Sequence, residues 1–196
     1  MSRLALYGGG FDPVHEGHVR VAREAADAFA LSRVLFVPAD NPPHKDLRAP
    51  YEHRVRMLEL ALAGDERLEA SRLDAGTTHS YSIDTIGRLR RQIDPADQLF
   101  FLIGADAFAE IETWVRWRDV LRAVEFIVVS RPGHRYSIPT GARVHRLDTL
   151  SLEHSSSGIR GALAATGDAE GLAPAVLAYI RENGLYGVPL KQWQRS

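Results

Sequence analysis

Residues 3–19 read RLALYGGGFDPVHEGHV, an apolar run followed by three glycines, Phe-Asp-Pro and two histidines. The run Arg3–Tyr7 predicts a buried strand, and apolar residues at helical spacing predict a helix over Gly17–Leu31. The glycines fall between the two, where they admit a ligand close to the backbone. The unpaired amides that begin a helix favour an anion. The stretch therefore predicts an anion-binding turn at the carboxyl end of the first strand.

Strands and amphipathic helices alternate along the rest of the chain. Apolar runs predict five more strands, at Arg33–Pro38, Arg67–Leu73, Gln98–Ile103, Phe126–Ser130 and Arg143–Leu147. Periodicity and capping residues predict helices at Tyr51–Ala63 and Ser82–Gln92, after Ser155–Ser157, and from Pro174 to Asn183. This order predicts an α/β fold: a Rossmann-like, doubly wound parallel sheet with helices on both faces and a small helical C-terminal end. We expect a single domain over residues 1–196, helical from about residue 155, with a ligand site where the strand order reverses.

Composition narrows the classes of partner. The chain has 196 residues, 45% of them hydrophobic, and no cysteine, which excludes disulfides and thiolate metal sites. A formal net charge of −1 provides no basic field for nucleic acid. The N-terminal apolar stretch is too short for a signal peptide or a membrane span. We therefore expect a cytoplasmic protein with no nucleic-acid or membrane partner, and the sequence leaves monomer and homo-oligomer both open.

His15 and His18 lie three residues apart at the start of the first predicted helix, where both can face one ligand. A dinucleotide fingerprint is excluded because Pro13 occupies the position of its third glycine. A zinc-peptidase motif is excluded because it needs histidines four apart on a formed helix. Taken alone, the pair also fits a glycine turn with two surface histidines.

The full string resembles the G-[ST]-F-D-P-x-H-x-G-H signature of the HxGH nucleotidyltransferase superfamily. Seven fixed positions match: Gly9, Phe11, Asp12, Pro13, His15, Gly17 and His18. At roughly 5% usage per residue type, chance agreement at one start is on the order of 10⁻⁹. Gly10 stands where that superfamily usually has Ser or Thr, so only its backbone amide remains to contact a phosphate.

A second stretch, HSSSGIR at His154–Arg160, resembles the I-S-S-T-x-I-R segment of the same superfamily. Ser155, Ser156 and Ser157 can cap a helix and offer hydroxyl and amide donors. Arg160, one turn further, has the forked donors that suit phosphate oxygens. By itself the stretch also fits an ordinary serine cap beside an exposed arginine.

Three further stretches resemble bacterial nicotinate-mononucleotide adenylyltransferases, a family within that superfamily. They are NPPHK at Asn41–Lys45, SYSIDTI at Ser80–Ile86 and GADAFAEIETWVRW at Gly104–Trp117. The resemblance implies that Lys45 reaches a triphosphate and that Thr85, with nearby helix-start amides, meets a nicotinate carboxylate. It also implies that Asp106 binds ribose hydroxyls, that Trp114 stacks on the pyridine ring and that Trp117 walls the pocket. Taken singly, these residues also fit a solvated loop lysine, a helix first turn and core tryptophans.

The resemblance implies adenylyl transfer from ATP to nicotinate mononucleotide, giving deamido-NAD and pyrophosphate by direct in-line attack of the substrate phosphate. The implied catalytic residues are His15, His18, Lys45 and Arg160. The implied ATP-binding set adds the glycines, an aromatic residue and the serine triplet: Gly8, Gly9, Gly10, Phe11, Ser155, Ser156 and Ser157. Asp12 is expected at the substrate, touching a metal-bound water, and Mg²⁺ is expected to arrive with ATP rather than in a dedicated protein site. Two alternatives stay open: an adenylyltransferase acting on nicotinamide mononucleotide or phosphopantetheine, and a noncatalytic nucleotide-binding regulatory module.

Overall fold

A computed structural model describes residues 1–43, 46–131, 133, 135–149 and 154–190. At its centre is a parallel sheet of six strands in the order β3-β2-β1-β4-β5-β6. The strands are β1 Arg3–Gly9, β2 Arg33–Pro38, β3 Leu68–Ala70, β4 Gln98–Gly104, β5 Glu125–Ser130 and β6 Val144–Asp148. Each overlaps a strand predicted from the sequence, although β3 is shorter than the predicted Arg67–Leu73.

The strand order reverses between β1 and β4. The chain first moves outward from β1 to β2 and β3, through α1 (Glu16–Ala28) and α2 (Tyr51–Leu62). It then returns through α3 (Ser82–Arg90) to place β4 on the other side of β1, with Leu6 opposite Phe101. Ligands of doubly wound sheets bind outside the carboxyl ends of the strands at such a reversal. The glycine turn lies at this position, because it directly follows β1.

Alternate residues of each strand enter two apolar cores, one on each face of the sheet. Ala5 and Phe36 belong to the core under α1, α2, α6 (Ser156–Thr166) and α7 (Pro174–Asn183). Leu6 and Phe101 belong to the core under α3, α4 (Ala105–Ala109) and α5 (Trp117–Ala123). The predicted Rossmann-like sheet with helices on both faces is therefore confirmed.

The structure contains helical segments that the sequence did not predict. α4, the 3₁₀ turn η1 (Ile111–Thr113) and α5 occupy most of the segment between β4 and β5. None is longer than seven residues, and Arg116 breaks the path with a left-handed backbone (φ 53°). Such short pieces carry too few turns to give a helical periodicity. A similar backbone feature ends α1 at Ala28, earlier than predicted, because Ala30 has a φ of 48°.

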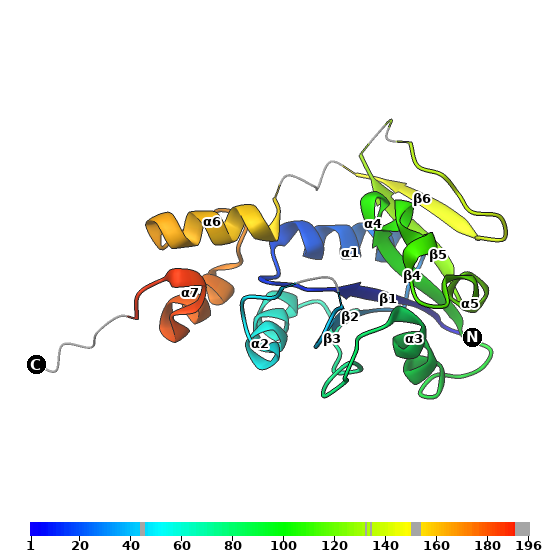
Figure 1. Ribbon diagram of the computed structural model, residues 1–196, viewed down its shortest axis with the longest axis horizontal. Coiled ribbons are helices and arrows are strands. Elements are labelled where there is room, and N and C mark those ends of the chain that lie inside the picture. Colours follow the sequence, from blue (N-terminus) through cyan, green and yellow to red (C-terminus); the bar gives the residue numbers. More distant parts are fainter. Residues whose placement is uncertain (44–45, 132, 134, 150–153, 191–196) are drawn as a thin grey trace, which may run out of the picture.

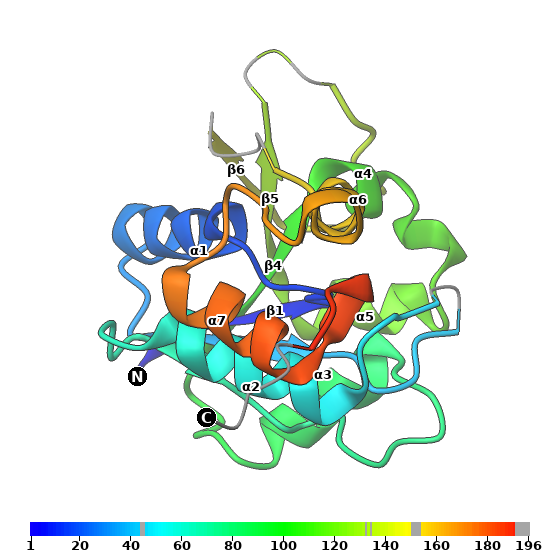
Figure 2. The ribbon, with the colours of Figure 1, turned by 90° about the vertical axis from the view of Figure 1, so that its left-hand side faces the viewer.

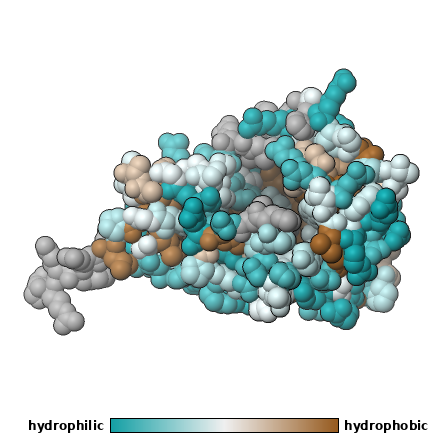
Figure 3. Space-filling model, viewed as in Figure 1, coloured by the Kyte–Doolittle hydropathy of each residue, from teal (hydrophilic) through white to brown (hydrophobic). Residues whose placement is uncertain are grey.

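The carboxyl end of β1 points toward the end of the molecule at which α6 and α7 lie (Figure 1). Viewed from that end, α1, α6 and α7 surround the tip of β1 (Figure 2). On the face shown in Figure 3, hydrophilic residues predominate and hydrophobic ones form only small groups. Among the described residues, no helix has the length and apolar character needed to cross a membrane.

Candidate active site

A cavity of about 320 Å³ opens at the strand reversal, between the carboxyl ends of β1 and β4. Five of the predicted site residues line it: Gly8, Gly9, Gly10, Thr85 and Trp114. We call the part beside the glycines the turn end. We call the part lined by Asp74, Tyr81, Thr85, Phe101 and Trp114 the aromatic end. The structure thus joins the first signature to two stretches that lie about 70 and 100 residues further along the chain.

The backbone of the glycine turn packs against its own neighbours. A Cβ atom placed on Gly10 would lie 2.9 Å from Cδ2 of Leu47, and one on Gly9 would lie 3.0 Å from the Phe11 ring. Phe11 itself has a left-handed backbone, with a φ of 47°. This crowding explains why position 10 is a glycine in this chain: a serine or threonine there would require Leu47 to move.

The two histidines lie together at the start of α1. His15 is the N-cap residue, and its main-chain N–H donates to Nδ1 of His18 at 3.2 Å. The imidazole rings are stacked, with centroids 3.7 Å apart and planes 30° apart. Because Nδ1 of His18 accepts a hydrogen bond, the neutral ring carries its proton on Nε2. His18 therefore has an Nε2–H donor of fixed position.

His15 is buried and electrically neutral near pH 7. The residue is 7% exposed, and its Nδ1 has no hydrogen-bond partner of normal geometry among the described residues. Burial, and secondly the charge of His154, lowers the pKa of His15 to about 4. A phosphate placed against this ring would have the opposite effect, because a nearby negative charge favours the imidazolium form.

Asp12 links the glycine turn to other segments of the chain. The residue is 3% exposed, and its carboxylate accepts hydrogen bonds from the main-chain N–H groups of Arg48 (2.6 Å) and Ala49 (3.0 Å) and from the Tyr186 hydroxyl (2.7 Å). These donors all come from the protein itself, and they bring two distant segments, at residues 48–49 and 186, to one residue. The structure therefore gives Asp12 a supporting position, and its contact with substrate or metal-bound water stays a prediction.

The second signature meets the first at this turn. Arg160 donates from Nη1 to the main-chain oxygen of Asp12 at 2.7 Å, and the Ser156 hydroxyl donates to the main-chain oxygen of Pro13 at 3.0 Å. Ser155 is the N-cap of α6 and accepts from the amide of Gly158 at 3.2 Å. The start of α6 is thus attached to the glycine turn, and the binding of ATP phosphates by Arg160 and the serine triplet stays a prediction. Lys45, the remaining predicted catalytic residue, lies outside the described residues.

Arg54 is a buried residue of this site that sequence reasoning missed. Its side chain is among the most deeply buried in the protein, and it donates to three main-chain oxygens: those of Ala49 (3.1 Å), Gly10 (2.9 Å) and Ala39 (2.8 Å). One guanidinium therefore holds the glycine turn beside both ends of the 40–48 loop. Burial lowers the pKa of Arg54, and the charge of Asp12 opposes that effect. The sequence does contain a sign of this role: Arg54 is a charged residue on the apolar face of α2, one turn before Leu58.

Side chains, rather than the backbone, organise the aromatic end. Thr85 is 4% exposed, and its hydroxyl lies 2.7 Å from Oδ1 of Asp74 and 3.2 Å from the main-chain oxygen of Tyr81. Trp114 packs edge-on against Phe101, with ring centroids 5.8 Å apart. The cavity thus has an aromatic wall next to a buried polar pair.

Two predicted residues lie apart from this wall. Among the described residues, Asp106 and Trp117 are not part of the cavity lining. Asp106 is exposed on α4, and Trp117 is half-buried with the Arg118 guanidinium 4.2 Å from its ring centroid. Their roles in binding ribose and walling the pocket stay predictions.

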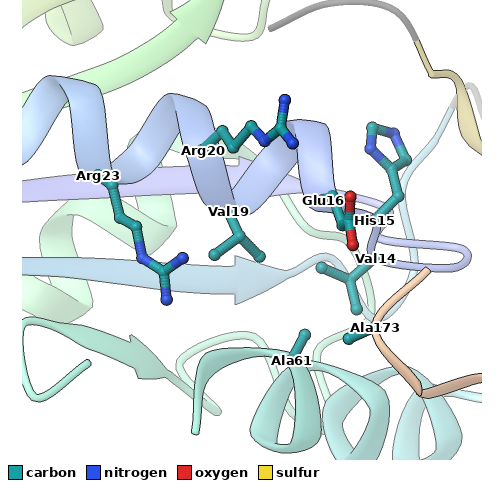
Figure 4. A pocket seen from close by; sticks show the side chains of 8 residues that line it. All are labelled: Val14, His15, Glu16, Val19, Arg20, Arg23, Ala61 and Ala173. Atoms are coloured by element: carbon teal, nitrogen blue, oxygen red, sulfur yellow. The ribbon is translucent and has the colours of Figure 1, made fainter. Parts of the chain in front are cut away.

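A second cavity, of about 280 Å³, lies between α1, α2 and the segment before α7. Val14, Val19, Ala61 and Ala173 converge on it. His15 is also among its lining residues, and not among those of the first cavity, although its imidazole ring points away from these apolar side chains (Figure 4). The first and second cavities have no lining residue in common among those described. The glycine turn and the aromatic wall therefore belong to the first cavity alone.

Comparisons with known proteins agree with this arrangement. The model of the cytidylyltransferase-like family matches residues 6–162. A protein of Solibacter usitatus named as a probable nicotinate-nucleotide adenylyltransferase is 60% identical over 186 residues, which cover 94% of this chain and 99% of that protein. One of Pelobacter propionicus with the same name is 39% identical over 213 aligned residues, covering 94% and 98%.

A solved structure shares the fold at lower identity. The nicotinic acid mononucleotide adenylyltransferase of Plasmodium falciparum, complexed with NaAD, superposes with a TM-score of 0.81 at 18% identity, covering 96% of this chain and 99% of that one. At that identity the likeness concerns the fold, whereas the family follows from the sequence matches. The chain belongs to the cytidylyltransferase-like family and, within it, to the nicotinate-nucleotide adenylyltransferases.

Proposed function

We propose that this protein transfers the adenylyl group of ATP to nicotinate mononucleotide, forming deamido-NAD and pyrophosphate. The observation that carries the proposal is the continuous cavity at the strand reversal. Its turn end offers glycine backbone, which suits phosphates, and the stacked pair His15 and His18 follows that backbone in the chain at the start of α1, outside the described lining of the cavity. Its aromatic end offers Trp114 beside Thr85, which suits a flat, polar ring. A molecule with a phosphate at one end and a pyridine ring at the other fits both.

The chemistry needs no nucleophile from the protein. The second pKa of a phosphate monoester is about 6, so the attacking oxygen of the mononucleotide is already ionised at neutral pH. It can attack the α-phosphorus of ATP directly, with pyrophosphate leaving on the opposite side. The protein then contributes by holding two polyanions in line and by stabilising the charge that develops on the transferred group.

The histidines supply that stabilisation. The Nε2–H of His18 is oriented by the hydrogen bond at Nδ1, so it can donate in a defined direction to a phosphate oxygen. His15, neutral in the absence of ligand, takes up a proton as the triphosphate approaches and becomes a second, charge-assisted donor. Arg160 and Asp12 hold the turn on which both rings are mounted. Lys45 stays a proposed partner of the phosphates.

We also propose that Mg²⁺ accompanies the triphosphate. Among the described residues, no three His, Asp or Glu side chains are placed to share a metal ion. The carboxylate of Asp12 is already occupied by three donors from the protein. Phosphate oxygens and water would therefore provide most ligands of the ion, as Mg²⁺ commonly allows, and its charge would lessen the repulsion between the two substrates.

The test is pyrophosphate release from ATP with each of three acceptors: nicotinate mononucleotide, nicotinamide mononucleotide and phosphopantetheine. We expect the highest kcat/KM with nicotinate mononucleotide. Equal values for the acid and the amide would contradict the choice of acceptor. Release with none of the three would favour a noncatalytic nucleotide-binding module. A cytoplasmic location is part of the same proposal, since ATP and the mononucleotide are substrates of the cell interior.

A further inference from the structure

The aromatic end of the cavity contains a buried carboxylate. Asp74 is 3% exposed and lines the cavity beside Thr85. Its Oδ1 accepts from the Thr85 hydroxyl at 2.7 Å and from Nη1 of Arg88 at 2.8 Å. Burial raises the pKa of Asp74, and the bond from Thr85 and the charge of Arg88 oppose that rise. The pyridine ring of the proposed acceptor also carries a carboxylate, and Asp74 would repel it unless the charge of Asp74 is balanced.

The hydroxyl of Thr85 cannot donate to such a ring while Asp74 is ionised. A hydroxyl has one hydrogen, and both acceptors near that of Thr85 belong to the protein: Asp74 and the main-chain oxygen of Tyr81. Toward the cavity, Thr85 therefore offers lone pairs only. Lone pairs accept from the NH₂ group of an amide, but they repel a carboxylate. This contact alone would favour nicotinamide over nicotinate.

The charged residues around the cavity also disfavour a nicotinate ring. Its described lining residues include two carboxylates, Asp74 and Glu110, and no lysine, arginine or histidine. The charge of Asp40 also acts on Asp74. An anionic ring entering this end would meet a negative potential unless a cation lies behind the wall. Arg88, one turn along α3 from Thr85, is such a cation, and it is in contact with Asp74.

We propose that the Asp74–Arg88 ion pair determines the choice between acid and amide at the aromatic end. Arg88 cancels the charge of Asp74, so that the wall behind Thr85 is neutral and the helix-start amides of α3 can attract a carboxylate. Asp74 in turn fixes the direction of the Thr85 hydroxyl. Asp74 and Arg88 are specificity determinants that act through Thr85 and through charge. This inference rests on the proposed function, because it concerns the ring of that acceptor.

The two halves of the pair make opposite predictions. Asp74→Asn removes the negative charge and leaves that of Arg88, so the ratio of kcat/KM for acid over amide should rise about three- to tenfold. Arg88→Met leaves the carboxylate uncompensated, so the same ratio should fall by a similar factor. The double variant should return close to the wild-type ratio. A merely structural role would move both ratios in one direction, or neither.

The control is Asp65→Asn. Asp65 also accepts from arginines, Arg23 and Arg67, and its side chain is 14% exposed, but it lies before β3 at the amino edge of the sheet. Its replacement should leave the ratio unchanged. Thermal unfolding of every variant and calorimetric Kd values for both mononucleotides separate lost folding from altered choice. If Asp74→Asn does not fold, the role of the ion pair is decided by Arg88→Met alone, for which we expect a lower ratio of kcat/KM for acid over amide.

The outcomes separate this inference from the function on which it rests. A wild-type protein that adenylates neither mononucleotide would overturn the proposed function. An active wild type whose Arg88→Met ratio is unchanged or raised would overturn the role of the ion pair and leave the function intact.

Discussion

The two ends of the cavity are built in different ways. At the turn end, ligand-facing groups are mostly backbone, and side chains from distant segments hold that backbone: Arg54, Arg160 and Tyr186 all contact the turn or its Asp12. At the aromatic end, ligand-facing groups are side chains. The hydrogen-bond partners of Asp74 and Thr85 lie within residues 74–88, and Trp114 packs against Phe101. Ligand binding at the turn end therefore depends on the shape of the backbone, whereas ligand binding at the aromatic end depends on the balance of charge. Substitutions should therefore affect the rate at one end and the choice of acceptor at the other.

The largest effect is expected from His18→Ala, which removes the Nε2–H donor in the first turn of α1. Loss of one such donor typically lowers kcat by ~10²–10³. Steady-state kinetics with nicotinate mononucleotide, and an unfolding curve to show that the variant is folded, provide the check. Wild-type kcat in a folded variant would remove His18 from the mechanism, and with it the distinction between the two ends.

Acid should destabilise the folded protein through His15. The folded-state pKa is about 4, against an ordinary value of 6.5. As pH falls from 6.5 toward 4, the unfolded chain binds this proton first, so the free energy of unfolding decreases, by about 3 kcal/mol once pH is below 4. His15→Gln should remove that part of the pH dependence in urea titrations. An NMR titration that finds the ligand-free ring titrating near 6.5 would contradict the buried, neutral state.

Tyr186→Phe tests whether the turn depends on its distant supports. It removes one hydrogen bond to the buried carboxylate of Asp12, which should lower the free energy of unfolding by about 2 kcal/mol and raise KM for ATP. Tyr179→Phe is the matched control, because its hydroxyl bonds His53 at 2.8 Å, away from the cavity lining. We expect a loss of about 1 kcal/mol there and an unchanged KM for ATP. Equal effects of the two variants on ATP would show that Asp12 needs no such support.

The smallest effect is expected at the aromatic end, from Trp114→Phe. Weaker stacking should raise KM for nicotinate mononucleotide by roughly two- to tenfold and leave KM for ATP unchanged. Trp117→Phe makes the comparison sharper. The sequence-based role of Trp117 predicts a similar rise, whereas its position outside the described cavity lining predicts none. The two KM values decide between these expectations.

The strands and the turn after β1 were easier to predict from the sequence than the contacts between distant side chains. The strands and the turn after β1 could be predicted because apolar runs and a contiguous motif specify them locally. α4 and α5 could not, since pieces this short show no periodicity. The support of Asp12 by Tyr186 was equally hidden, because 174 residues separate the two and no pattern links them. Asp74 gave no signal either: its meaning depends on Arg88 and Thr85 being folded against it.

The bond between Tyr186 and Asp12 also has a consequence for biosynthesis of the chain. The ribosome adds Tyr186 174 residues after Asp12, so the turn emerges long before this support exists. Nucleotide affinity should therefore arise late, when the segment that contains Tyr186 closes onto the turn. A nascent chain halted before residue 156 would expose the whole first signature and still hold ATP poorly.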